Sequence, residues 1–440
     1  MVEKHKKEND PKIDKEGKKL AREKKYLQFG VKQSLYQGSG SINVIPEILK
    51  TEGWNRVMLI ADPDLYRLGV INPVENILKN AEGIEYFVFT DLVPNPEAKT
   101  IDEKANPAYR KFNADVMIAV GGGSTMDTAK GVAIAGDSGK SCVDPSFLFG
   151  IDPHKPFEHK TFPIIAIPTT AGTGSDVCRN AVICNYEGEK IVPSHDCILP
   201  PYSIMDPDLL AGLPRSVAAA TSIDALTHGL ESYTSMSAND FTETFSLRSL
   251  ELIGEAIRPF CANPAEDKWA NMMSLGCMYS GFSLGIASIG QDHVITHPMS
   301  EAPFHMPHGD ACGMVLPAVI EWNGEGCKEK YRKAYNALTG KHLEETEFEV
   351  QMLINWVIDL NVDLNIAKNM TFEEWGYNDD DVLELMLKHP IFNGKDTTPN
   401  NRCNYPRVTR AKDFRYLIQR TNEYSKVQKA RAEAKKNLAK

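Results

Sequence analysis

Short, nearly continuous apolar runs that alternate with helical patterns constrain the first half of the chain more than any other feature. Four such runs lie at residues 56–62, 84–90, 116–120 and 163–168. Strands that are apolar at successive positions must be buried on both faces, which requires a parallel sheet with helices on either side. We therefore expect a doubly wound, mostly parallel α/β domain over residues 26–205.

The second half of the chain has a different pattern. From about residue 206 the strand-like runs become rare, and Leu, Ala, Met and Glu recur at helical spacing. This pattern indicates an all-helical domain over residues 206–440, with a site expected in the cleft between the two halves. Helices are predicted at residues 209–233, 241–257, 270–284, 348–359 and 379–388.

Charge and cysteine usage exclude several classes of protein. The 440 residues carry a formal net charge of -10, which argues against nucleic acid as a partner. No apolar run reaches the roughly 18 residues that a membrane span needs. Nine scattered cysteines without C-x-x-C spacing are typical of reduced thiols in a cytoplasmic protein.

The first 25 residues form a separate, charged extension. Residues 1–25 alternate Lys-rich clusters with acidic residues and lack the apolar core of a secretory signal. We interpret this extension as a solvated, frayed helix, with a docking or encapsulation tail as the alternative.

A glycine-rich turn follows the third apolar run. Gly121, Gly122, Gly123 and Ser124 precede a predicted helix start near Met126. Glycines let a phosphate approach the backbone, and the start of a helix offers free N–H groups. Ser124 could cap this helix or donate to a phosphate oxygen. A tight turn without a ligand is the alternative.

A loop rich in hydroxyl groups follows the fourth run. Residues 168–175 read Pro-Thr-Thr-Ala-Gly-Thr-Gly-Ser, which suits hydrogen bonding to a polar ligand. Together the two loops favour a bound dinucleotide more than either does alone. Asp62 ends the first run, where an acid can accept from ribose hydroxyls and repel a 2′-phosphate, favouring NAD over NADP. Simple capping of the turn at Pro63 is the alternative.

Histidines crowd into one short stretch of the second half. His293 and His297 are four residues apart and share one helical face, as do Asp224 and His228 further upstream. Two facing helices with such pairs could present a carboxylate and imidazoles to one divalent ion, such as Fe(II) or Zn(II). A single histidine is more often structural, but the two pairs and the Pro-His-Gly turn at 307–309 favour a metal site.

Taken together, these segments resemble the iron-containing (group III) alcohol dehydrogenase family, from about Tyr36 to Asp413. The charged residues 1–25 and the Lys-rich tail beyond Lys426 lie outside the resemblance. The segments that carry it are residues 91–96, 121–130, 167–175, 205–207, 224–231, 293–298 and 307–309.

The resemblance implies a role for each matching residue. Asp224, His228, His293 and His308 would bind the metal, for which we expect Fe(II), with Zn(II) as the alternative. His297 would relay a proton near the nicotinamide. The cofactor-binding positions would be Asp62, Asn95, Gly121, Gly122, Gly123, Ser124, Asp127, Thr169, Thr170, Thr173 and Lys190.

Three departures from the family pattern bear on the site. Asp176 stands where the family usually has Glu. The extra His305 competes with His308, which we prefer as ligand because of its Pro-His-Gly context. Gln291 and Asp292 stand where the family tends to be apolar, which indicates either a polar substrate or a partner for a ligand histidine.

The expected function is that of a metal-dependent, NAD(H)-linked alcohol dehydrogenase or aldehyde reductase. It would transfer hydride between the nicotinamide and a small, in part polar, aldehyde or alcohol. We expect a cytoplasmic homodimer or larger homo-oligomer, with no nucleic-acid or membrane partner. The alternatives are an NAD-using lyase similar to dehydroquinate synthase, a metal-dependent hydrolase and a catalytically silent scaffold.

Overall fold

The structure is a computed structural model that describes residues 32–147, 159–301, 304–388, 406–407 and 409–438. The charged extension at residues 1–25 lies outside the described residues, so its helix stays a prediction.

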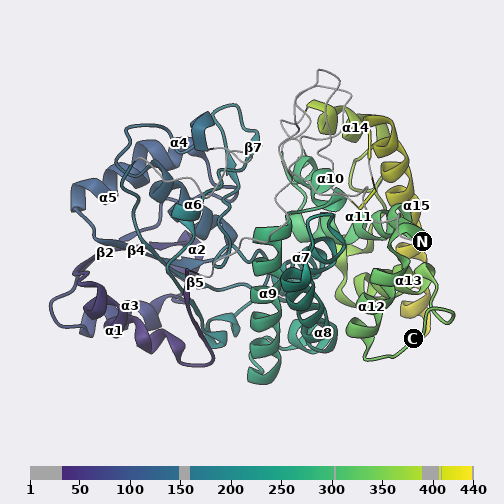
Figure 1. Cartoon of the computed structure of the whole chain (residues 1–440), viewed down its shortest axis with the longest axis horizontal. Helices are drawn as coiled ribbons and strands as arrows, with labels where there is room; N and C mark the ends of the chain where they lie inside the picture. The colour runs from purple at the N-terminus through teal and green to yellow at the C-terminus, as the bar shows by residue number, and fades with distance from the viewer. Residues whose placement is uncertain (1–31, 148–158, 302–303, 389–405, 408, 439–440) are drawn as a thin grey trace, which may run out of the picture. The chain divides into compact units, whose positions relative to one another are not determined.

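Six strands form one parallel sheet in the first half of the chain, in the order β1-β8-β5-β4-β2-β3 (Figure 1). The four apolar runs of the sequence become β2 to β5, and the predicted doubly wound, parallel class is confirmed. The strands are β1 (Ser34–Gln37), β2 (Arg56–Ala61), β3 (Glu85–Phe89), β4 (Val116–Gly121), β5 (Ile164–Pro168) and β8 (Tyr202–Met205).

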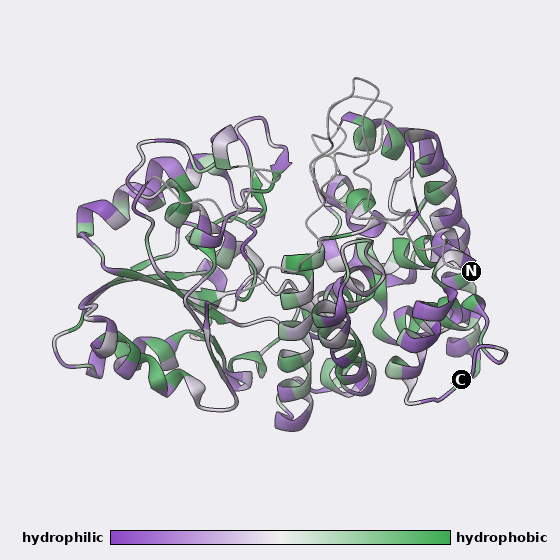
Figure 2. Cartoon of the chain, viewed as in Figure 1, coloured by the Kyte–Doolittle hydropathy of each residue, from purple (hydrophilic) through white to green (hydrophobic). Residues whose placement is uncertain are grey.

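Helices cover both faces of this sheet. In β2, Val57 and Leu59 join the core under α1 and α3, whereas Met58 and Ile60 join the core under α5 and α6. Figure 1 shows these helices on opposite sides of the strands, and Figure 2 shows the strands as largely apolar. The helices are α1 (Ile45–Glu52), α2 (Pro63–Arg67), α3 (Asn72–Asn80), α4 (Ala98–Thr100), α5 (Asn106–Phe112) and α6 (Gly123–Ala135), with a π-helical turn at Ile101–Ala105.

Helix α6 begins earlier than the sequence predicts. Its N-cap is Gly122, and no side chain caps it. Ser124 therefore lies inside the first turn. It does not cap the helix, which was one of the two roles that the sequence suggested for it.

Beyond Asp206 the described residues contain helices and no strand. The predicted helix at 209–233 is divided: Pro207–Leu210 form a 3-10 turn, and α7 starts only after Pro214. Proline has no backbone N–H to lose and is tolerated at a helix start. The helices are α7 (Arg215–Thr234), α8 (Asp240–Ala262), α9 (Asp267–Ala287), α10 (Gln291–Met299), α11 (His308–Asn323), α12 (Lys328–Thr339), α13 (Val350–Leu364), α14 (Asp379–Lys388) and α15 (Ala411–Leu438).

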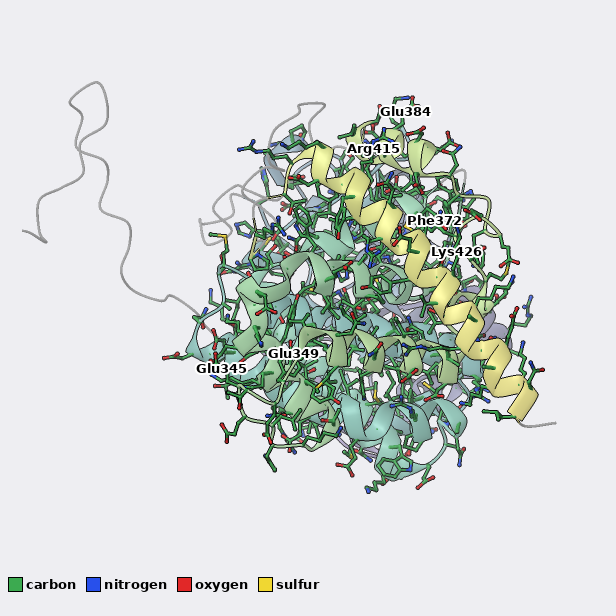
Figure 3. All side chains as sticks on the ribbon, turned by 90° about the vertical axis from the view of Figure 1, so that its right-hand side faces the viewer. Glu345, Glu349, Phe372, Glu384, Arg415 and Lys426 are labelled. Atoms are coloured by element: carbon green, nitrogen blue, oxygen red, sulfur yellow. The ribbon has the colours of Figure 1, made fainter. Side chains whose placement is uncertain are left out.

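The Lys-rich end of the chain is part of a long helix. Helix α15 packs against α11 and α13, and Leu417 and Ile418 are fully buried. Its exposed face forms ion pairs, among them Lys426 with Glu373 at 2.9 Å; Figure 3 shows Lys426 on this helix. Residues 427–438 therefore belong to this helix.

A sharp bend separates α9 from α10. Ser288 at the bend has a left-handed φ of 67°, and the two helices are bent by 103°. No described helix alone is long and apolar enough to span a membrane. Among the described helices, only this bent pair, taken together, has that length and composition.

A buried carboxylate joins β1 and β8 to the start of the helical part. Asp206, 1% exposed, accepts hydrogen bonds from the backbone N–H groups of Gly40 (3.2 Å), Ile42 (3.1 Å) and Asp208 (3.1 Å). Each of these amides would lose its partner without the carboxylate. The division into two domains near this residue stays a prediction.

We expect Asp206→Ala to lower the free energy of unfolding by about 2–4 kcal/mol, because it removes the partner of the buried Ile42 amide and of the part-buried Gly40 and Asp208 amides. Chemical denaturation measures this loss. The exposed neighbour Asp208 is the control, and Asp208→Ala should change stability by less than about 0.5 kcal/mol. Equal effects of the two substitutions would contradict the role given to Asp206.

Candidate functional site

Helix α7 presents three polar side chains along one buried face. Asp224, His228 and Glu231 follow one another at helical spacing, and each is at most 5% exposed. The Asp224 Oδ1 atom lies 3.5 Å from His228 Nε2. Such a face needs partners from other helices, because buried charges are stable only when paired.

Two further imidazoles meet the same carboxylate oxygen. His293 on α10 places Nε2 3.4 Å from Asp224 Oδ1, and His308 at the start of α11 places Nε2 3.7 Å from it. A metal about 2.0–2.2 Å from each ligand would set tetrahedral ligand atoms roughly 3.3–3.6 Å apart. Each of the three nitrogens therefore lies from the Asp224 oxygen at close to the spacing expected between two ligands of one metal ion.

The charges of the cluster also fit a cation. Asp224, Glu231 and Asp292 are all buried, and no described lysine or arginine forms an ion pair with any of them. Among the described residues, no N–H or O–H group donates a hydrogen bond to either carboxyl oxygen of Asp292. Burial, with the negative charge of Glu231, raises the pKa of Asp292 well above its ordinary value. A divalent ion would add positive charge beside these carboxylates.

The imidazoles differ in their proton affinity. Burial lowers the pKa of His228, and lowers that of His308 to about 3, so both rings are neutral and can act as ligands at neutral pH. Burial acts in the same direction on His293, but Glu231 and Asp224 outweigh it and raise its pKa to about 10. In the metal-free protein, His293 therefore carries the positive charge that balances these carboxylates.

Two glycines allow α10 and α11 to approach α7 closely. A Cβ atom at Gly290 would lie 2.6 Å from Glu231 Oε1, and one at Gly309 would lie 1.8 Å from the carbonyl oxygen of Ala220. Any side chain at either position would push the helix away. These contacts help to set the positions of His293, three residues after Gly290, and of His308, directly before Gly309.

Glu231 orients His293 and is a residue to which the sequence analysis gave no role. Its Oε2 accepts from His293 Nδ1 at 2.6 Å and from the Gly290 N–H at 2.9 Å, and its Oε1 accepts from the Asp292 N–H at 2.7 Å. The bond to Nδ1 leaves Nε2 directed at Asp224. The signal in the sequence was its place seven residues after Asp224, on the same helical face.

Gln291, for which the sequence offered a substrate contact or a ligand partner, has other surroundings. Gln291 donates to Thr409 at 3.1 Å and to Asn323 at 3.2 Å, so its amide ties α10 to the scaffold. The partner of the His293 ring is Glu231.

The two remaining histidines of this stretch lie in different surroundings. The buried His297 ring lies 5.4 Å from His308 and 6.0 Å from His293, between ring centroids. His305 is exposed, with a left-handed φ of 51°. The structure therefore places His308, and not His305, beside Asp224.

A cysteine missed by the sequence analysis also borders the cluster. Cys312 on α11 lies one turn after His308, with Sγ 3.8 Å from His308 Nε2. The ligand atoms of Asp224, His293, His308 and Cys312 all lie within 4.8 Å of one another. The spacing of four residues from His308 was the available signal.

The glycine-rich turn at residues 121–124 and the hydroxyl-rich loop at residues 168–175 lie against each other. The Thr169 N–H donates to the Gly121 carbonyl at 2.9 Å, and a Cβ atom at Gly123 would lie 2.7 Å from Thr173 Cγ2. The hydroxyl of Thr169 is buried and has no partner in the described residues. The loops thus form one surface at the start of α6, where free N–H groups suit an anion.

Asp127 supports this surface from behind. It accepts from the Ser175 hydroxyl at 2.6 Å and from the Val182 N–H at 3.1 Å. The Lys130 amine donates to Ser175 at 2.8 Å. Asp127 therefore holds the second loop in place.

The other predicted cofactor positions lie in short elements or in the loops beside them. Asp62 caps α2, accepting from the Asp64 and Leu65 N–H groups. Asn95 has a left-handed φ of 55°. Lys190 lies on β7 (Lys190–Ile191), which pairs with β6 (Ile183–Cys184), and burial lowers its pKa.

Asp176 follows the second loop directly. It is buried and accepts from the Ser203 hydroxyl on β8 at 2.7 Å, so it anchors the end of the loop to the sheet.

Comparisons with known proteins agree on one group. A family model described as iron-containing alcohol dehydrogenase matches residues 32–207, and one for the C-terminal part of the Fe-containing alcohol dehydrogenase family matches residues 218–403. The chain is 33% identical to choline dehydrogenase of Bacillus subtilis over 83% of this chain and 89% of the relative. It is 30% identical to lactaldehyde reductase of Escherichia coli over 80% and 90%, respectively.

The chain is also similar to solved structures of alcohol dehydrogenases and related oxidoreductases. A 1,3-propanediol oxidoreductase superposes with a TM-score of 0.78 at 26% identity, covering 88% of this chain and 97% of that one. An alcohol dehydrogenase from Oenococcus oeni superposes with a TM-score of 0.77 at 27% identity, again over 88% and 97%.

The pair of Glu231 and His293 generates a prediction about pH. Because the pKa of His293 in the folded, metal-free protein exceeds its ordinary value, the pair stabilises the fold fully below about pH 6.5. This stabilisation is lost as the pH rises towards 10. We expect Glu231→Gln to lower the free energy of unfolding by about 1–3 kcal/mol more at about pH 6 than at about pH 10.

Urea denaturation of the metal-free protein at the two pH values measures this difference. Asp176→Asn is the control, because it neutralises a buried carboxylate that binds Ser203 and no histidine. The loss in free energy of unfolding caused by Asp176→Asn should be the same at both pH values. An equally pH-independent loss in Glu231→Gln would refute the assignment.

Proposed function

Because the chain belongs to the iron-containing alcohol dehydrogenase family, we propose that it interconverts small aldehydes and alcohols with NAD(H) at one divalent metal ion. The chain is thus an oxidoreductase of the alcohol dehydrogenase class. The observation that carries the proposed centre is the single carboxylate oxygen of Asp224 with three imidazole nitrogens 3.4–3.7 Å away. Membership of this family favours a dehydrogenase over the lyase, hydrolase and scaffold alternatives.

The proposed metal ligands are Asp224, His228, His293 and His308. One carboxylate and three imidazoles suit Fe(II), which we propose as the native ion, with Zn(II) as the alternative. His308 has 28% of its side chain exposed, against 7% or less for the other three. Substrate would therefore reach the centre from the side of His308.

The chemistry divides between the bound groups and the chain. When bound, the divalent ion polarises the carbonyl group of the aldehyde, and the nicotinamide supplies the hydride. Asp224 holds negative charge at the centre, and Glu231 keeps His293 in one orientation. His297 is proposed to deliver the proton to the product oxygen in the direction of alcohol formation.

The dinucleotide is proposed to lie on the surface formed by the two loops. Gly121, Gly122, Gly123 and Ser124 would bind the pyrophosphate, and Thr169, Thr170 and Thr173 would line the cofactor. The unpartnered Thr169 hydroxyl supports this placement. Asn95, Asp127 and Lys190 are proposed at the edge of the same site, with Asp127 acting through Ser175.

The substrate is proposed as a small, in part polar, aldehyde. The names of the relatives refer to choline, lactaldehyde and long-chain alcohols, so they differ in substrate. We propose further that the chain works as a homodimer or larger homo-oligomer in the cytoplasm.

The first test is NADH oxidation with a panel of small aldehydes by protein loaded with Fe(II) or Zn(II). We expect metal-dependent turnover, and we expect His308→Ala to lose bound metal and activity together, by about 100-fold or more in activity. His305→Asn is the matched control, since Asn tolerates the left-handed backbone at this position. Retained metal and turnover in His308→Ala would reject the ligand assignment, and no turnover by metal-loaded protein with any aldehyde would reject the function.

A second prediction concerns the choice of cofactor. Serine is also a good N-cap, so Asp62→Ser keeps the start of α2 and removes only the negative charge. We expect kcat/KM for NADH to exceed that for NADPH in the wild type, and the ratio to fall by about 10-fold in the variant. A wild-type preference for NADPH, or an unchanged ratio, would contradict the role of Asp62.

A further inference from the structure

Cys312 stands at the edge of the proposed metal centre without a role in it. It is fully buried on α11, and its Sγ lies 3.8 Å from His308 Nε2. Its Sγ also lies 3.7 Å from the hydroxyl of Thr296 on α10, and the thiol contacts the carboxyl group of Asp292. A sulfur and a nitrogen bound to one zinc at about 2.3 and 2.1 Å would lie roughly 3.6 Å apart. The observed separation is close to that value.

Cys312 shares three neighbours with the proposed ligand set. The donor atoms of Asp224, His293, His308 and Cys312 form a group in which every pair lies within 4.8 Å. His228 also approaches Asp224, at 3.5 Å, but does not belong to this group. Two different sets of four donors therefore share Asp224, His293 and His308, and differ only in His228 or Cys312 as the fourth member.

We infer that Cys312 is a further metal ligand, used by thiophilic ions such as Zn(II) and Co(II), whereas Fe(II) takes the set with His228. The inference rests on the proposed metal centre. Thiolate ligands favour zinc over harder ions, and imidazole serves both. On binding, the S–H bond of Cys312 breaks, the sulfur lone pair is donated to the ion, and the proton leaves to the buffer. The contact with Thr296 is given up at the same time.

The alternative is a thiol that only packs against Thr296 and Asp292 and binds no metal, and cobalt distinguishes the two. We load the whole protein with Co(II) under reducing, oxygen-free conditions and record its absorption spectrum. A Cys312 ligand gives an intense sulfur-to-cobalt charge-transfer band in the near ultraviolet beside the weaker d–d bands. Cys312→Ser should lose this band and bind Zn(II) at least about 10-fold more weakly, with Fe(II) affinity changed by less than about 3-fold.

Cys261→Ser is the matched control. Cys261 is also fully buried and also contacts a hydroxyl, that of Ser222 at 3.9 Å. This variant should keep the charge-transfer band. A band that persists in Cys312→Ser would overturn the inference, because another cysteine would then be the ligand.

X-ray absorption on the zinc-loaded wild type gives a test that needs no variant. One sulfur at about 2.3 Å from zinc is expected. Cobalt d–d bands without a charge-transfer band, or zinc with only nitrogen and oxygen neighbours, would overturn the role of Cys312 and leave the proposed dehydrogenase intact. Failure of the wild type to bind any of the three ions would overturn the metal centre as well.

Discussion

The hydrogen bonds of the Glu231 carboxylate set the geometry on which the histidine cluster depends. One oxygen receives the His293 ring and the Gly290 N–H, and the other receives the Asp292 N–H. The first N–H groups of α10 would otherwise have no partner, because a helix start leaves four of them unsatisfied. The same carboxylate thus stabilises the start of a helix and fixes the ring orientation of His293 in its first turn.

Helix α7 also connects this cluster with the loops of the α/β part. A Cβ atom at Gly172 would lie 2.7 Å from the Cβ of Thr221, one turn before Asp224. The loop that contains Gly172 touches Gly123 through Thr173. One helix therefore supports both the cluster of donors and the loop surface, and a shift of α7 would change the two together.

The sequence was informative wherever a pattern is local. Apolar runs predicted β2 to β5, because a strand buried on both faces lacks the usual alternation of apolar and polar residues. Helical spacing predicted that Asp224 shares a face with His228, and His293 with His297. It was less informative where the partner is remote in the chain. The contact of Glu231 with His293 and that of Cys312 with His308 depend on how helices approach one another, and Gln291 binds Thr409, far along the sequence. The sequence analysis also placed the start of α7 too early. Helical periodicity alone indicated one longer helix, whereas α7 starts only after Pro214.

The donors of the cluster come from three helices, α7, α10 and α11, and α7 is distant in the sequence from the other two. An ion held by all three would act as a removable crosslink within the fold. Its binding free energy would then add to the stability of the folded chain in proportion to the logarithm of the free ion concentration. For a cell, the lifetime of this protein would depend on metal supply, so that starvation for the ion would reduce its amount as well as its activity.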